Sequence, residues 1–215
     1  MVDAAALRSF DRRLEGVQVV AEGVARVAAY IGGAFLVVSA LIVTFDVVTR
    51  KLFLFSIAGA DELSGYALAA SMSWGYAYAL FCRAHIRVDA LYVRLPIRIA
   101  SVLDVLSLLL FAGVIGLANW HAWFVLSESI RMDAVSGTPL TTPMWIPQSV
   151  WLAGMLFFLL CILLVMLRSI ALLVAGDLDN LRRIAGAPSV QDEIESEIQH
   201  APASPSPVVA ERSNH

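Results

Sequence analysis

The residues of this chain that could carry out chemistry are a few charged side chains set in long apolar stretches. Asp46 and Arg50 lie four residues apart, and Asp61 and Glu62 are adjacent a short distance further along. An acid and a base at this spacing pair on one helix face, while an Asp close to a membrane is also a candidate for binding an ion. Adjacent acids are favoured at the positive end of a helix dipole. We therefore expect Asp46 and Arg50 to orient a helix end, and Asp61 and Glu62 to cap the next helix or to meet a soluble partner.

A second group of titratable residues lies in the stretch 84–98. Its members are His85, Arg87, Asp89, Arg94 and Arg98. The three arginines fall on one side of a helical wheel beside an apolar face, a pattern typical of a helix that lies in the membrane interface with its arginines toward anionic headgroups. We expect His85, Arg87 and Asp89 to hold this interfacial helix or a lipid headgroup rather than a substrate.

The sequence contains no pattern typical of an enzyme or a cofactor site. It has no Gly-rich phosphate loop, no His-Glu-x-x-His motif and no Ser/His/Asp set. Cys82 and Cys161 do not form a CxxC pair, and His121 is the only histidine within an apolar run, which disfavours a haem held by two histidines. The net charge is −3 without a basic tract, which argues against nucleic-acid binding. We expect no catalysis, no metal and no other cofactor.

The composition places these residues in a membrane protein. Of the 215 residues, 59% are apolar and 15% are charged, whereas a soluble domain is about 45–50% apolar and about 25% charged. A bilayer core of about 30 Å requires roughly 20 helical residues. The stretches without Asp, Glu, Lys or Arg are 27–45, 63–82, 105–127 and 134–167. The sequence therefore predicts an all-α, integral membrane four-helix bundle over 25–175, with spans at about 25–48, 61–83, 99–127 and 145–172 and the interfacial segment 84–98 between the second and the third.

The two ends of the chain differ from this membrane domain. In residues 1–24, charged side chains are interspersed with apolar ones at three- and four-residue spacing, which predicts an amphipathic helix. Such a helix lies on the membrane surface or docks a partner protein. Residues 176–215 are acidic and then rich in Pro and Ser, which predicts a disordered tail.

The distribution of Lys and Arg predicts the orientation of the chain. Twelve of these residues fall on the side of the two termini, and three fall on the opposite side, namely Arg50, Lys51 and Arg131. Because loops rich in Lys and Arg stay in the cytoplasm, both termini are expected there. Tryptophan rings favour the headgroup level, and four of them lie near the loop after Arg131: Trp120, Trp123, Trp145 and Trp151.

A small residue recurs at every fourth position of the second predicted span. These residues are Gly65, Ala69, Ser73 and Ala77. Small side chains let helix backbones approach closely in lipid, where no hydrophobic effect drives helices together. The stripe predicts close packing, either within the four-helix bundle or against another membrane protein.

Four segments of the chain together resemble a known family. They are Asp46-Val-Val-Thr-Arg50, Gly59-Ala-Asp-Glu-Leu-Ser64, Ala84-His-Ile-Arg-Val-Asp89 and Thr138-Pro-Leu-Thr-Thr-Pro-Met-Trp-Ile-Pro147. Their order between the predicted spans is similar to that of the small permease component of tripartite ATP-independent periplasmic (TRAP) transporters, over about residues 25–172. The loop between the first two spans departs from the family pattern, because it reads Leu52-Phe-Leu-Phe-Ser-Ile-Ala58 where Asn and Pro are usual.

The resemblance implies a role within a larger transporter of the bacterial inner membrane. In this family a periplasmic binding protein delivers an organic acid to a large membrane subunit, which holds the substrate and sodium sites and moves the acid with a sodium gradient. The small subunit is a scaffold for the large one. The partners implied are therefore the large TRAP membrane subunit, the periplasmic substrate-binding protein and membrane lipids.

The sequence by itself leaves two other functions possible. A self-sufficient small transporter or channel would depend on Asp46 and Asp104, acids that lie within or beside the spans. A membrane electron-transfer subunit would hold a haem. In a scaffold, by contrast, Asp104 is expected to form a structural ion pair with Arg94 or Arg98.

Overall fold

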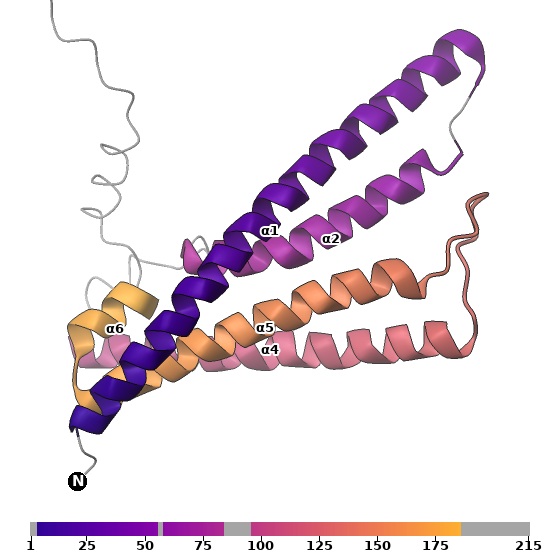
Figure 1. Ribbon diagram of the computed structural model, residues 1–215. Helices are drawn as coiled ribbons and strands as arrows, with labels where there is room; N and C mark the ends of the chain where they lie inside the picture. Colours follow the sequence, from indigo (N-terminus) through magenta and orange to yellow (C-terminus); the bar gives the residue numbers. More distant parts are fainter. Residues whose placement is uncertain (1–3, 56–57, 84–95, 186–215) are drawn as a thin grey trace, which may run out of the picture.

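The computed structural model describes residues 4–55, 58–83 and 96–185, and the regular structure in these segments is helical (Figure 1). The helices are α1 (Ala4–Phe53), α2 (Ala60–Phe81), α4 (Ile97–Arg131), α5 (Trp145–Ala175) and α6 (Leu178–Ala185). The β pairing seen in these segments is one isolated bridge, between Val135 and Pro143. The all-α prediction is confirmed for this part of the chain.

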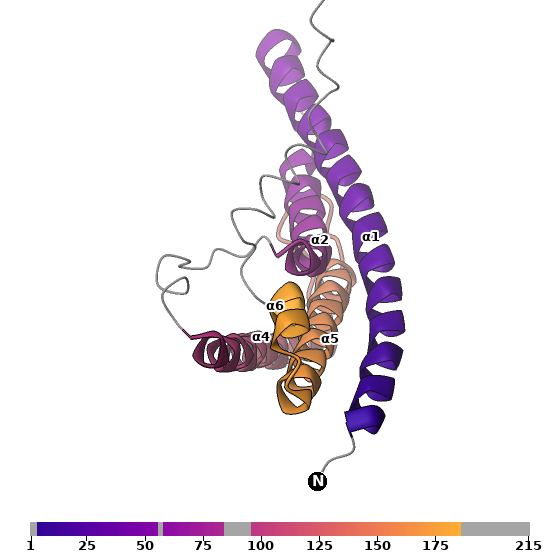
Figure 2. The same cartoon turned by 90° about the vertical axis from the view of Figure 1, so that its left-hand side faces the viewer.

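The long helices form two antiparallel hairpins, α1–α2 and α4–α5, which spread apart toward one end of the molecule (Figures 1 and 2). We call the end at which α1 and α4 finish the loop end. The terminal end is the opposite one, where α1 begins and α6 follows α5. Among the described helices, α5 packs against α1, α2, α4 and α6. It is therefore the centre of the fold, and it joins the two hairpins.

Three of the described helices are long and apolar enough to cross a membrane, within the ranges Arg13–Phe53, Ile99–Arg131 and Trp145–Ala175. Helix α2 is not among them, because Ser, Gly, Tyr and Trp make up much of its length. Its 22 residues nevertheless extend about 33 Å at ~1.5 Å per residue, which matches a bilayer core. The second span therefore stays a prediction, supported by helix length and by packing beside α1.

Helix α1 is continuous through the predicted boundary between residues 24 and 25. Its 50 residues extend about 75 Å, far more than one bilayer core. Ala21, Ala25 and Gly32 face the other helices, whereas Val17 and Val24 are exposed. The predicted N-terminal helix is thus the first part of a longer one, and small residues form the face that packs.

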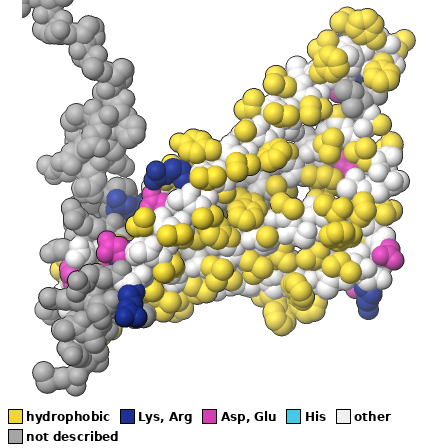
Figure 3. Space-filling view, viewed as in Figure 1, with side chains coloured by type: hydrophobic (Ala, Val, Ile, Leu, Met, Phe, Trp, Pro, Cys, Tyr) yellow, Lys and Arg dark blue, Asp and Glu magenta, His cyan; other side chains and the backbone are white. Residues whose placement is uncertain are grey.

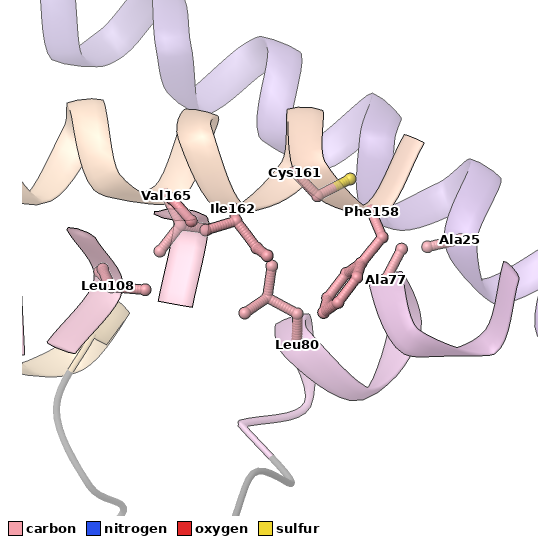
Figure 4. Close-up of a cluster of buried hydrophobic side chains, with 9 residues drawn as sticks. Ala25, Ala77, Leu80, Leu108, Phe158, Cys161, Ile162 and Val165 are labelled. Carbon is pink, nitrogen blue, oxygen red and sulfur yellow. The ribbon is translucent and has the colours of Figure 1, made fainter. Parts of the chain in front are cut away.

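A core of small and aliphatic side chains joins the long helices in the half nearer the terminal end (Figure 4). The ring of Phe158 lies 5.5 Å from that of Tyr76 and 5.7 Å from that of Phe111. The buried members are Ala25, Ala77, Leu80, Leu108, Ala112, Phe158, Cys161, Ile162 and Val165. A smaller cluster that belongs only to α4 and α5 contains Ala122, Leu126 and Leu152. Because close side-chain packing is a main force between helices in lipid, the hairpins are held together chiefly in the terminal half.

The prediction of a disordered tail is wrong for residues 178–185, which form α6. The carboxylate of Asp177 accepts a hydrogen bond from the Asn180 backbone N–H at 3.3 Å, which caps the new helix. Leu181 is fully buried, and α6 packs on α4 and α5. The low apolar content of the tail as a whole conceals this short apolar face. Residues 186–215 lie outside the described part of the chain.

Candidate functional site

Charged and polar side chains from α1, α2 and the α4–α5 loop gather at the loop end. This polar cluster consists of Asp46, Arg50, Asp61, Glu62, Tyr66, Ser136 and Thr138. Asp46 is 1% exposed, and its carboxylate pairs with the guanidinium of Arg50. Asp61, in the first turn of α2, is exposed and adds electrostatic attraction to Arg50. The i,i+4 pair considered from the sequence is therefore formed, and the second helix adds a further acid beside it.

Glu62 connects the start of α2 to the loop between α4 and α5. Its carboxylate accepts hydrogen bonds from the hydroxyl of Tyr66, at 2.5 Å, and from the hydroxyl of Thr138. The hydroxyls of Ser136 and Thr138 lie 2.9 Å apart. Hydrogen bonds to an ionised acceptor are stronger than neutral ones. Glu62 therefore fixes the loop over the first turn of α2.

The sequence suggested that Asp61 and Glu62 cap α2, and both do lie in its first turn, where the helix dipole favours acids. The N-cap itself is Gly59, with φ 87° and no side-chain capping hydrogen bond. A Cβ on Gly59 would lie 2.1 Å from Cδ1 of Leu140. The loop thus packs directly on the helix start, and both the positive φ and this close approach favour glycine.

The predicted interfacial group falls almost wholly outside the described residues. His85, Arg87, Asp89 and Arg94 lie in 84–95. Arg98 lies in the first turn of α4, but its side chain is not among those described. The roles of these residues stay predictions from the sequence.

The stripe of small residues on α2 divides into two halves. Ser73 and Ala77 are fully buried, and a Cβ on Gly154 of α5 would lie 2.5 Å from the Ser73 hydroxyl. Gly65 and Ala69, nearer the loop end, are exposed. The stripe therefore packs within the chain only where the hairpins are in contact.

One buried ion pair, at the terminal end, is not anticipated by the sequence analysis. Arg168 of α5 is 6% exposed, and its Nε donates to the Asp11 carboxylate at 3.0 Å. Its Nη1 donates to Oε1 of Gln18 at 2.6 Å. Asp11 and Gln18 are seven residues apart and share one face of α1. This spacing, together with a lone arginine in an apolar helix, is the signal that could have revealed the contact.

The acids near the described spans have partners within the chain. Asp46 and Glu62 are already engaged within the chain, and Asp104, buried in α4, also has an interaction partner. In the described segments, no three His, Cys, Asp or Glu side chains are grouped as metal ligands. The cluster presents the exposed side chains of Arg50 and Asp61 on a fixed support.

Comparison with known protein families identifies the family of this chain. A family model for the DctQ component of tripartite ATP-independent periplasmic transporters matches residues 39–172, which is more than half of the chain. The chain belongs to the DctQ family. Neither curated proteins nor solved structures give a significant match. The resemblance seen in four separate sequence segments is therefore confirmed.

The part of this DctQ chain that matches the family begins within α1 and ends in the last turns of α5. It contains the whole polar cluster and most of the buried core. Asp11 and Gln18 precede it, as does Ala25, and α6 follows it. The contact of Arg168 with Asp11 therefore ties the first turns of α1, outside the matched segment, to the family's helices.

Replacing Glu62 with glutamine is expected to loosen the α4–α5 loop, because the amide keeps the shape of the side chain but loses its charge. The measurement is hydrogen exchange of the loop amides. The N–H groups of Ser136 and Met144 bond the carbonyls of Thr142 and Ala134, both at 2.9 Å, and should exchange faster in the variant. Glu128→Gln, which alters an exposed acid at the same end, is the control. Equal exchange in the two variants would show that Glu62 does not hold the loop.

Proposed function

We propose that this DctQ chain is the scaffold subunit of a TRAP transporter. It holds a large ion-coupled membrane subunit, which takes up an organic acid using a sodium gradient. A periplasmic binding protein delivers the acid. The loop end faces the periplasm and both termini lie in the cytoplasm of the bacterial cell. Membership in the DctQ family is the observation that carries this proposal.

The uncovered surface of α1 supports a role beside a larger membrane partner. In its most apolar stretch, 11% of α1 is buried within the chain, compared with 39% for α5. Such surface is stable only against lipid or another membrane protein. The exposed half of the α2 stripe, Gly65 and Ala69, is also suited to close approach of a further helix. The α1–α2 hairpin therefore offers the large subunit an extended apolar face.

The ion pairs of the buried charged residues favour the role of a scaffold over that of a carrier. Acids that bind and release ions in a transporter change partners during transport. Asp46 instead lies buried in an ion pair with Arg50 on its own helix, and Arg168 is held by two residues of α1. At the loop end, the exposed charges of Asp61 and Arg131 are available to meet the binding protein. Charges at the rim of an interface act mainly on the rate of encounter.

Reconstitution in liposomes tests the proposal. The chain alone, the large subunit alone and both together are inserted under an inward sodium gradient, with the binding protein and a radiolabelled organic acid that it retains. We expect uptake only when all three proteins are present. Sodium-driven uptake by this chain alone would refute the scaffold role and favour a self-sufficient transporter. In that case Asp46→Asn would also abolish the flux.

A further inference from the structure

Four consecutive large apolar side chains are exposed where α1 ends. They are Leu52, Phe53, Leu54 and Phe55, with 69%, 74%, 93% and 63% of their surfaces exposed. We call residues 52–55 the apolar tip. In Figure 3 the corresponding end of α1, at the upper right, is covered by hydrophobic side chains.

The geometry of the apolar tip limits what could cover it. Successive residues of a helix point about 100° apart. Helix α1 ends at Phe53, and Leu54 adopts a left-handed conformation with φ 54°, which turns the backbone away from the helix axis. The four side chains therefore project to different sides. A folded protein partner would cover the side chains on one side of the apolar tip, whereas lipid can surround all four of them.

The charges next to the apolar tip fit a membrane surface. Arg50 and Lys51 directly precede it, and both are exposed. Basic residues at the end of a span place their charges among lipid phosphates, and aromatic rings favour the same interfacial layer. The exposed valines and phenylalanine of the preceding turns, Phe45, Val47 and Val48, continue the apolar surface from the span to the tip.

We propose that the apolar tip inserts into the interfacial layer of the phospholipid bilayer, with Arg50 and Lys51 beside the lipid phosphates. The turn of the α1–α2 hairpin is thus anchored by lipid. Where α2 begins, Leu140 of the α4–α5 loop packs on Gly59. This inference depends on insertion of the chain in a membrane and not on its role in transport.

The test uses the full chain in nanodiscs of phosphatidylethanolamine and phosphatidylglycerol. On a Cys82→Ser, Cys161→Ala background, Leu54→Cys carries an environment-sensitive NBD label. The matched control is Gly137→Cys with the same label. Gly137 is an exposed glycine of the α4–α5 loop, and nothing lies within 4 Å of a Cβ added there. We expect quenching at position 54 by lipids that bear a nitroxide near the headgroup, and quenching by aqueous iodide several-fold weaker than at position 137.

Two outcomes would overturn the inference. The first is iodide quenching at position 54 as strong as at position 137, which would place the tip in water. The second is protection from iodide that appears only after the large subunit or the binding protein is added, which would assign the tip to a protein interface. A further variant excludes insertion driven by the label itself. Adding Phe53→Ser and Phe55→Ser should return the label at position 54 to water, and a label that stays in lipid would show that these side chains do not anchor the turn.

Discussion

Replacing Arg168 with alanine is expected to lower the free energy of unfolding by about 3 kcal/mol. The change would leave the Asp11 carboxylate and the Gln18 amide without the guanidinium that they share. Breaking a buried ion pair costs about 3–5 kcal/mol, and 18% exposure of the Asp11 side chain places the value at the lower end. Chemical denaturation of the purified chain in detergent micelles measures the loss.

Arg26→Ala is the matched control for this prediction. Arg26 also pairs with an acid, Glu22 at 2.9 Å, but the two side chains are 55% and 39% exposed. Exposed pairs on a helix contribute about 0.3–0.5 kcal/mol, so the control should unfold almost as the parent does. A second variant, with both Arg168→Leu and Asp11→Leu, should recover much of the stability, because no charge is then left unpaired. Similar losses for Arg168→Ala and Arg26→Ala would mean that the buried pair does not hold α1 on α5.

The long helices are predictable because local signals bound them. The third predicted span, 99–127, lies within α4 (Ile97–Arg131), and the fourth, 145–172, lies within α5 (Trp145–Ala175). The charges at Glu128 and Arg131 and the prolines of the following loop mark these ends in the sequence itself. The i,i+4 spacing of Asp46 and Arg50 is local in the same sense, and the structure forms that pair.

Contacts between distant segments could not be predicted in this way. Arg168 meets Asp11 across 157 positions, and Thr138 meets Glu62 across 76. Both contacts depend on how the two hairpins pack together, and the spacing of residues along one helix does not predict that packing. The division of the α2 stripe has the same cause, because Ser73 is buried where α5 approaches α2, whereas Gly65 lies beyond this approach and is exposed.

Replacing Gly154 with valine is expected to weaken the contact of α2 with α5, at a cost of about 2–3 kcal/mol. A Cβ at this position would lie 2.5 Å from the Ser73 hydroxyl oxygen and 2.7 Å from Cδ1 of Trp74. The serine hydroxyl can rotate, but the indole is constrained. Its Nε1 donates to the carbonyl of Val150 at 3.2 Å, and its ring stacks on Phe157 at 5.7 Å. Relief of the clash therefore requires α2 and α5 to move apart.

The site at which hydrogen exchange rises in Gly154→Val distinguishes separation of α2 from α5 from general unfolding. Helices α2 and α5 join the two hairpins, so hydrogen exchange should rise in α2 near Ser73 while the α4–α5 contact through Ala122 and Leu152 stays protected. Gly113→Val is the control, because nothing lies within 4 Å of a Cβ at that position of α4 and valine has a higher helix propensity than glycine. If Gly113→Val destabilised the chain as much as Gly154→Val, the cost would come from valine in a membrane helix and not from the close approach of α2 to α5. A selective loss at Gly154 would instead show that this contact helps to hold the α1–α2 hairpin, with its uncovered apolar face, in a fixed position beside α4 and α5.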